Sequence, residues 1–304
     1  MSGEVEAVAG RVAPAWPTGQ GRPWFHVLWR FARREPLGFC GGCLLAVLLL
    51  LALCSPLVSR YDPLALAPRE SFVSPGDGSH WLGTDHLGRD LFSRVLYGGR
   101  ASLGTAAVAL LLGATIGTAL GLISGYSNNF LSQAVQRCID ALMALPPLIL
   151  ALAIAASMGS GVTTVLVAIA VVMVPSFARV VRGTTLSVAS SDYVMAAVTM
   201  GATPARVLLR HVVPNIVGTV ITLLSIWVGN AILVEAALGF LGVGIQPPNP
   251  TWGNMLANEG RSYMLTAPWL AIVPGAAITL TVLCSNLLGD AVRTTLDPRL
   301  RFRE

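Results

Sequence analysis

The side chains that could bind a metal ion gather in one polar stretch of an otherwise apolar sequence. This stretch contains His80, Asp85, His86 and Asp90. The four-residue separation of His86 and Asp90 would place both side chains on one face of a helix. Imidazole and carboxylate groups are common ligands of divalent metals, so a metal site is one interpretation of this stretch.

The competing interpretation of the same stretch is structural. Thr84 or Asp85 would cap a short interfacial helix, because both side chains can accept a hydrogen bond from a free backbone N–H group. Asp85 or Asp90 would pair with Arg89 or Arg94. The apolar face of this helix would consist of Leu91, Val95 and Leu96.

Several other chemistries are excluded by residue type. All 20 basic residues are arginine. Without lysine the chain has no Walker A phosphate loop, no Schiff-base lysine and no lysine general base. Cys40 and Cys43 have CxxC spacing but lie in an apolar run, so they are interpreted as small packing residues. The five cysteines are an odd number, and four lie well inside apolar runs, which argues against a disulfide framework.

The composition indicates where the chain resides. Of its 304 residues, 54% are hydrophobic and 12% are charged, and the mean hydropathy is +0.69. Soluble domains are about 25% charged, so this chain lacks the polar residues needed to cover a surface in water. The composition therefore predicts an integral membrane protein.

Charge-free runs of about 20 residues, the length that crosses a bilayer core, predict six transmembrane helices. One run, 141–178, is long enough for two antiparallel helices joined by a tight turn at Gly159–Gly161. Asp140, just before this run, and Glu235, near the outer end of the fifth span, are expected to lie close enough to an interface to be solvated. The other runs are 37–59, 101–125, 212–234 and 269–288.

Arginine placement predicts that both termini are cytoplasmic. With that orientation the inside segments hold 14 arginines and the outside segments hold six. The predicted organisation is a cytoplasmic tail (1–37, with 1–23 disordered), a first transmembrane helix (38–58), an extracytoplasmic loop with a short interfacial helix (59–100), a core of five transmembrane helices (101–290) that includes an inside loop (179–214), and a cytoplasmic C-terminal tail (291–304).

The inside loop has its own helical pattern. Ser190, Ser191 and Asp192 offer capping groups before a helix over 193–200. Gly201 permits a chain reversal, and Thr203 with Pro204 starts a second helix that stops before Pro214. The apolar residues of this loop need a partner. Packing against the chain's own transmembrane helices and docking into another protein are equally compatible with the pattern.

Several blocks resemble one family, the permease subunits of ABC importers. Ala196-Ala197, Gly201 and Val212-Val213-Pro214-Asn215 resemble its ATPase-coupling loop. Three further blocks resemble the C-type subunit of the dipeptide, oligopeptide and nickel branch: His80 to Asp90 with Ser93-Arg94 and Tyr97-Gly98; Glu235 to Gly242 with Pro247-Pro248 and Thr251-Trp252-Gly253; and Asn286 to Asp290 with Arg293 and Leu296 to Arg299. The match runs in order over about residues 30 to 302.

The resemblance implies an all-α, type I ABC importer permease fold in a bacterial cytoplasmic (inner) membrane. It implies a second homologous permease, two ABC ATPase subunits and an extracytoplasmic solute-binding protein as partners, with ATP and Mg²⁺ on the ATPases. This chain is then no enzyme, binds no cofactor or metal and has no nucleic-acid partner. The metal interpretation is disfavoured because His80 to Asp90 lies in a block that peptide importers share. The coupling residues would be Asp192, Tyr193, Ala196, Ala197, Gly201, Thr203, Pro204 and Pro214.

One position departs from the family pattern: the acid that opens the coupling motif in many ABC importers is Met195 here. The predicted solute is a dipeptide or oligopeptide, with nickel or glutathione as the alternative. Ser225, Asn230 and Asn286 are candidates for lining the path. A secondary transporter is disfavoured because there is no internal repeat or mid-span charge, and an intramembrane hydrolase because no histidine falls within a span.

Overall fold

The computed structural model describes residue 29, residues 31–127 and residues 129–296. The predicted disordered tail (1–23) and the end of the C-terminal motif (297–299) lie outside the described residues. Contacts divide the chain into Met1–Pro36 and Leu37–Glu304, and the following description concerns the second unit. Its regular elements are helices, and no strand occurs among the residues described.

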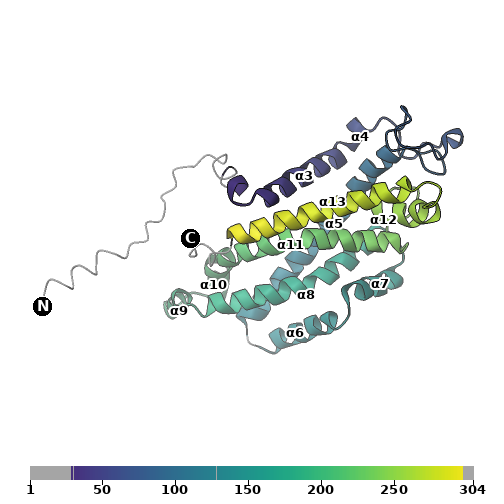
Figure 1. The fold of residues 1–304 in the computed structure, drawn as a ribbon. Helices are drawn as coiled ribbons and strands as arrows, with labels where there is room; N and C mark the ends of the chain where they lie inside the picture. Colours follow the sequence, from purple (N-terminus) through teal and green to yellow (C-terminus); the bar gives the residue numbers. More distant parts are fainter. Residues whose placement is uncertain (1–28, 30, 128, 297–304) are drawn as a thin grey trace. The chain divides into compact units, whose positions relative to one another are not determined.

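The helices follow one another as shown in Figure 1. Those of the first half are α3 (Pro36–Leu53), α4 (Ser55–Val58), α5 (Leu91–Tyr126), α6 (Phe130–Met143) and α7 (Pro147–Met158). Those of the second half are α8 (Val162–Ala189), α9 (Asp192–Thr199), α10 (Pro204–Val207), α11 (Val213–Phe240), α12 (Trp252–Met255) and α13 (Trp269–Leu296). Two π-helical turns, Leu208–Val212 and Leu256–Gly260, follow α10 and α12.

Five of these helical segments are long and apolar enough to cross a membrane, namely α3, α5, α8, α10 continued through α11, and α13. The pair α6 and α7 meets the same criterion only when taken together, and it is bent by 96°. The prediction of six spans therefore holds if this broken pair is one span. The tight turn predicted before α8 is present, with Gly159 at φ +80° and Gly161 at φ +149°.

The prediction of a separate short interfacial helix before the second span is wrong. Leu91 begins α5, which continues without a break for 36 residues to Tyr126. Its N-cap is Asp90, whose side chain accepts a hydrogen bond from the Ser93 N–H at 2.8 Å, and not Thr84 or Asp85. The second span was expected to start at residue 101, where the charge-free run begins, but the helix carries Arg94 and Arg100 in its first turns.

A stripe of glycines on α5 brings this helix against α8. Gly113, Gly117, Gly121 and Gly125 recur every four residues and therefore lie on one face. A Cβ added at Gly117 would lie 2.7 Å from the Phe177 Cβ, and the other three positions are equally tight against α8. Small residues at this spacing allow two helix backbones to approach closely in membranes. The α5–α8 pair is the centre of the buried core, which includes Met173 and Phe177.

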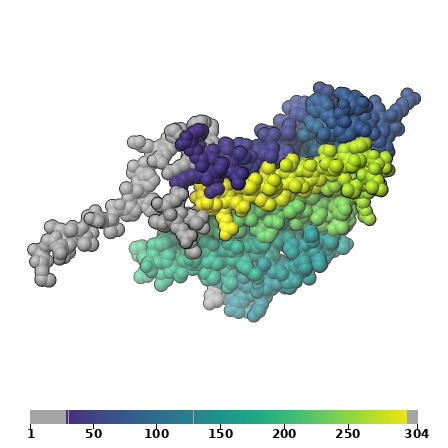
Figure 2. Space-filling view, in the orientation of Figure 1, coloured from purple at the N-terminus to yellow at the C-terminus, as the bar shows by residue number. Residues whose placement is uncertain are grey.

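The last helix, α13, also packs through small residues. Gly41 on α3 would bring a Cβ within 2.9 Å of the Leu287 Cβ, and Gly289 faces the Ser225 carbonyl of α11. In Figure 2 the side chains of α13 (yellow) lie between those of α3 (purple) and α11 (green). The helices that flank α13 are thus held by close backbone contact on both sides.

The helix after the inside loop does not stop before Pro214, as the sequence had suggested. The π-helical turn Leu208–Val212 carries α10 into α11, where Pro214 occupies the first turn. Proline has no N–H and cannot complete the regular helical ladder behind it. Widening the preceding turn is a known way for a helix to accommodate such a gap without ending.

Candidate functional site

The inside loop has the predicted form of helix, glycine turn and helix. Gly201 has φ +86°, which residues with a Cβ rarely adopt. The N–H of Ala202 donates to the Ala197 carbonyl at 3.0 Å, and the N–H of Gly201 donates to the Val198 carbonyl at 2.9 Å. These two bonds form a Schellman motif, which ends a helix on a left-handed residue. Thr203 and Pro204 then occupy the N-cap and first position of α10.

One face of α9 anchors the loop to the transmembrane helices. Val194 and Ala197 are buried, and so is Val207 of α10. Val194 and Val207 pack with Val181 of α8 and Ile216 of α11 in one apolar cluster. The interpretation that the loop packs on its own helices is therefore confirmed for this face.

The opposite face of α9 is apolar and exposed. Tyr193, Met195 and Val198 are about half exposed, and Met200 is 82% exposed. The position that departs from the family pattern, Met195, thus contributes an apolar side chain to this surface. Of the predicted coupling residues, Ala197 is buried, whereas Asp192, Tyr193, Ala196, Gly201, Thr203, Pro204 and Pro214 are exposed.

At the other end of α5, a buried network of charges joins two distant parts of the sequence. The Arg89 Nε donates to Asp85 Oδ2 at 2.6 Å, as one of the predicted pairings required. Both Arg89 and Arg94 also donate to Glu259 Oε1, at 2.7 and 3.1 Å. All four side chains are at most 7% exposed. Two guanidinium and two carboxylate groups therefore balance one another away from water.

The second predicted acid of this stretch, Asp90, pairs with a histidine and with neither arginine. Its Oδ1 lies 2.8 Å from His80 Nδ1, and His80 Nε2 lies 3.2 Å from Glu70 Oε2. Burial lowers the pKa of His80, but its hydrogen bonds and charge interactions with Asp90 and Glu70 outweigh burial, so the pKa is raised above 6.5. The imidazole thus links Glu70 in the loop to Asp90 at the N-terminus of α5, and both contacts favour its protonated form.

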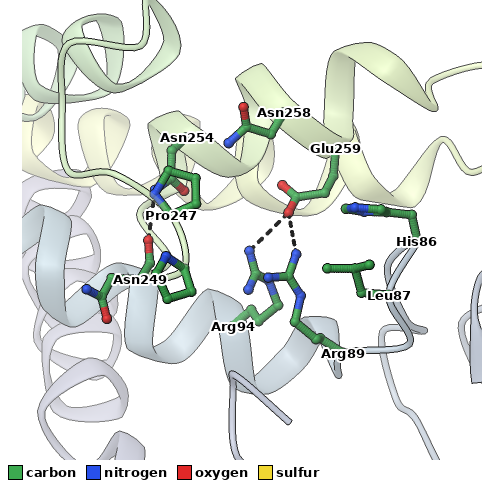
Figure 3. Close-up of a pocket in the computed structure, with 10 residues that line it drawn as sticks. His86, Leu87, Arg89, Arg94, Pro247, Asn249, Asn254, Asn258 and Glu259 are labelled. Carbon is green, nitrogen blue, oxygen red and sulfur yellow. Dashed lines mark hydrogen bonds and ion pairs between the residues drawn. The ribbon is translucent and has the colours of Figure 1, made fainter. Parts of the chain in front are cut away.

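A cleft of about 230 Å³ opens beside the arginines (Figure 3). The prolines of the family block, Pro247 and Pro248, form one wall with Asn249. The Asn254 amide holds this wall in place by donating to the Asn249 carbonyl at 2.8 Å. Figure 3 shows the Glu259 carboxylate directed at both guanidinium groups, with the His86 ring beside it.

The His86–Asp90 metal pair, the disfavoured interpretation of this stretch, does not form, since Asp90 pairs with His80 while His86 stacks on Tyr263 at 5.2 Å. Ligand atoms of Asp85, His86 and Glu259 do lie within 4.8 Å of one another. However, both Asp85 oxygens already accept hydrogen bonds, and Glu259 Oε1 accepts from two arginines. A divalent cation there would displace or face two guanidinium charges, so these residues fit a metal ion poorly.

The predicted path residues lie on α11 and α13. Asn230 and Asn286 are exposed, and Asn286 Oδ1 lies against Gly229, the residue before Asn230. Ser225 is half-buried and donates to the Ile221 carbonyl of its own helix at 2.9 Å. The two asparagines thus share the α11–α13 seam, and the Ser225 carbonyl borders the same seam at Gly289.

The two acids near the predicted interfaces differ in their surroundings. Asp140 is exposed in this chain and pairs with Arg179 at 2.8 Å, and its solvation near an interface stays a prediction. Glu235 is only 2% exposed, so the same expectation is wrong for this residue. The reason is that α12 packs against α11 there, with Gly253 in contact with Ala236.

Comparison with known proteins identifies the family. Residues 117–302, which include the inside loop, the path candidates and Glu259, match the model described as binding-protein-dependent transport system inner membrane component. The chain belongs to this family. It is a multi-pass inner-membrane permease of an ABC importer.

Relatives of the permease include two named glutathione transport system permease protein GsiD. The one from Pectobacterium atrosepticum is 42% identical over 279 residues, with 92% of each chain covered. The one from Escherichia coli O6:K15:H31 is 39% identical, with 92% of this chain and 91% of the relative covered.

The fold matches a permease of known structure. Two crystal forms of the inward-facing MetNI methionine ABC transporter contain a chain with a TM-score of 0.55 and 17% identity. The alignment covers 67% of this permease and 96% of that chain. At this identity the likeness concerns the fold alone, and it confirms the predicted importer permease fold.

Two features were missed at the level of sequence. Glu259 lies 165 residues from Arg94, so no local pattern could connect them. The glycine stripe of α5 was visible as a four-residue repeat, 113 to 125, and repeated small residues are a known signal of helix contact in membranes.

Proposed function

We propose that the permease works in a complex with a second homologous permease, two ABC ATPase subunits and an extracytoplasmic solute-binding protein. ATP and Mg²⁺ belong to the ATPases, because this chain has no lysine for a P-loop. Through this complex a short peptide crosses the inner membrane.

The proposed contact with the ATPase rests on the packing of α9, which has one buried face and one exposed apolar face. Its buried face fixes the helix on α8 and α11, while its other face presents Tyr193, Met195 and Met200 to solvent. An exposed apolar patch on a loop between transmembrane helices is typical of a protein interface. Arg206 and Arg210 are also exposed in this loop and can add charge contacts at the rim.

In this proposal ATP-driven closure of the two ATPases draws the α9 helices of the two permeases together. Because α9 is anchored on α8 and α11, its displacement moves those helices, and the complex changes from inward-facing to outward-facing. The solute passes between the two permeases, beside Ser225, Asn230 and Asn286. Exposed amides on spanning helices are unfavourable against lipid, which supports a wet or partner-covered surface there.

The relatives support a short peptide as the solute. GsiD proteins are named for glutathione, itself a short peptide, and they match this permease over 92% of its length. Glutathione is therefore the first solute to test, followed by dipeptides and oligopeptides. Nickel remains a further outcome of the same test.

Coupling is tested by substituting Gly201, whose φ of +86° a β-branched residue would strain. In vesicles containing the whole complex, Gly201→Val should abolish solute-stimulated ATP hydrolysis and uptake while the complex remains assembled. Gly242→Val is the matched control, since Gly242 has φ +79° and nothing within 4 Å, but follows α11 at its other end. Normal uptake by the Gly201 variant would show that this loop is not the coupling element.

The solute is tested by measuring which compound the binding protein delivers to the reconstituted complex. Glutathione, a tripeptide of ordinary linkage and Ni²⁺ are supplied separately. Accumulation of glutathione or the tripeptide that depends on ATP supports the proposal. Accumulation of Ni²⁺ alone contradicts the peptide solute, and uptake by the purified permease without partners contradicts the complex.

A further inference from the structure

The break between α6 and α7 leaves backbone groups without helical partners. Residues 144–146 join the two helices, which are bent by 96°. Neither Pro146 nor Pro147 has an N–H, so the carbonyls of Leu142 and Met143, four residues earlier, cannot accept the usual helical hydrogen bond. No backbone hydrogen bond outside regular helices is made to these two carbonyls among the described residues.

Taken as one span, the bent pair α6 and α7 places the break inside the thickness of the membrane. The helix α7 has 12 residues, a length of about 18 Å, and it packs beside α8 from the turn at Gly159–Gly161. A bilayer core is about 30 Å thick, so α7 alone cannot cross it. Asp140 lies one turn before the break and pairs with Arg179 of α8, so the break lies beside this part of α8.

The surface around the break is uncovered in this chain. Every residue from Met143 to Ile149 is exposed. The side chains of the Asp140–Arg179 pair are 55% and 53% exposed. Hydrocarbon can satisfy neither free carbonyls nor an ion pair, and irregular backbone at membrane depth occurs only where protein or a water-filled cavity covers it.

We propose that the α6–α7 break, residues 142–149 with the Asp140–Arg179 pair, faces the water-filled solute path. This inference rests on the proposed function and adds a second polar surface to the α11–α13 seam. Water satisfies the free carbonyls when the path is empty. The same oxygens accept hydrogen bonds from the N–H and ammonium groups of a short peptide as it passes.

The side chains at the break suit such a path. Leu145, Leu148 and Ile149 are exposed and apolar, so they form a wall with no fixed charge. The Arg179 guanidinium is paired with Asp140, one turn before the break. A wall of this kind lets a zwitterionic peptide make weak, reversible contacts.

The inference is tested by the reactivity of a cysteine at the break. In a complex whose permease has its five native cysteines replaced by serine, Leu145→Cys is treated in vesicles with a charged, membrane-impermeant methanethiosulfonate. Leu50→Cys, at an exposed apolar position of α3, is the lipid-facing control, and Ser160→Cys, in the turn before α8, is the water-facing control. Leu148→Cys repeats the measurement if the first variant does not assemble.

The expected result is labelling of the break cysteine at least about tenfold faster than Leu50→Cys, because only a thiolate reacts and hydrocarbon keeps a thiol protonated. Labelling should slow when the transported peptide is present in excess. A break cysteine that is as inert as Leu50→Cys in every nucleotide state overturns the inference, whether lipid or the second permease covers it. Because labelling needs no uptake, a wrong solute would leave a reactive break, whereas peptide uptake with an inert break refutes this inference alone.

Discussion

The charge balance beside α5 makes a quantitative prediction about Glu259. Its Oε1 accepts hydrogen bonds from Arg89 and Arg94, and the three side chains are almost fully buried. Glu259→Gln keeps the shape but leaves Asp85 as the one carboxylate facing two buried guanidinium groups. Removing one partner from a buried ion pair destabilises a protein by about 3–5 kcal/mol. The equilibrium between folded and unfolded protein should therefore shift by roughly 10² to 10⁴-fold, at 1.4 kcal/mol for each factor of ten.

Pulse proteolysis of the solubilised complex over a series of denaturant concentrations measures this shift. Glu70→Gln is the control, because Glu70 contacts His80 from a side chain that is 55% exposed, and such pairs contribute about 0–1 kcal/mol. The double variant Glu259→Gln with Arg94→Gln restores one positive and one negative charge, so it should recover most of the loss. The reasoning is refuted if Glu259→Gln is as mild as Glu70→Gln, or if the double variant is less stable than the single one.

Two further predictions concern stability. Because the pKa of His80 is raised in the folded state, its contribution is fully present below pH 6.5 and is lost as the pH rises through the raised value. The stability difference between the wild type and His80→Gln should shrink over that range in thermal unfolding at pH 5.5 to 8.5, and a constant difference would contradict the assignment. Gly117→Ala places a Cβ 2.7 Å from Phe177 and should destabilise the protein by about 1–3 kcal/mol. Gly104→Ala on the same helix meets nothing within 4 Å and should instead add about 0.5–1 kcal/mol, so equal effects would show that the α5–α8 contact is looser than described.

The spans could be predicted because hydrocarbon imposes one simple rule on composition. The charge-free runs ended close to the observed ends at Tyr126 and Trp269, and the turn at Gly159–Gly161 was correct. The turn at Gly201 was predictable for a related reason, since a left-handed backbone favours glycine. In each case the structure depends on the hydropathy or backbone preference of residues that are neighbours in sequence.

The errors arose where contacts or backbone geometry that leave no mark in hydropathy decide the outcome. The charge-free run placed the start of the second span at residue 101, yet α5 begins at Leu91 and its Arg94 is paired with Glu259 from the far half of the chain. The pairing of Asp90 with His80 was also missed, although both residues were singled out, because the fold of the loop between them decides it. Pro214 was taken as an end because a π-helical turn that absorbs a proline leaves no mark in hydropathy.

The glycine stripe also determines which parts of the permease can change shape. Four tight contacts in successive turns hold α5 against α8. Sliding by less than a helical turn would move the α8 side chains from the glycines onto larger residues of α5. We expect a conformational change in this chain to occur elsewhere, at interruptions of regular helix such as the α6–α7 break and the π-helical turn before α11. The α5–α8 pair would then move as one rigid unit, and the chain would bend at these interruptions.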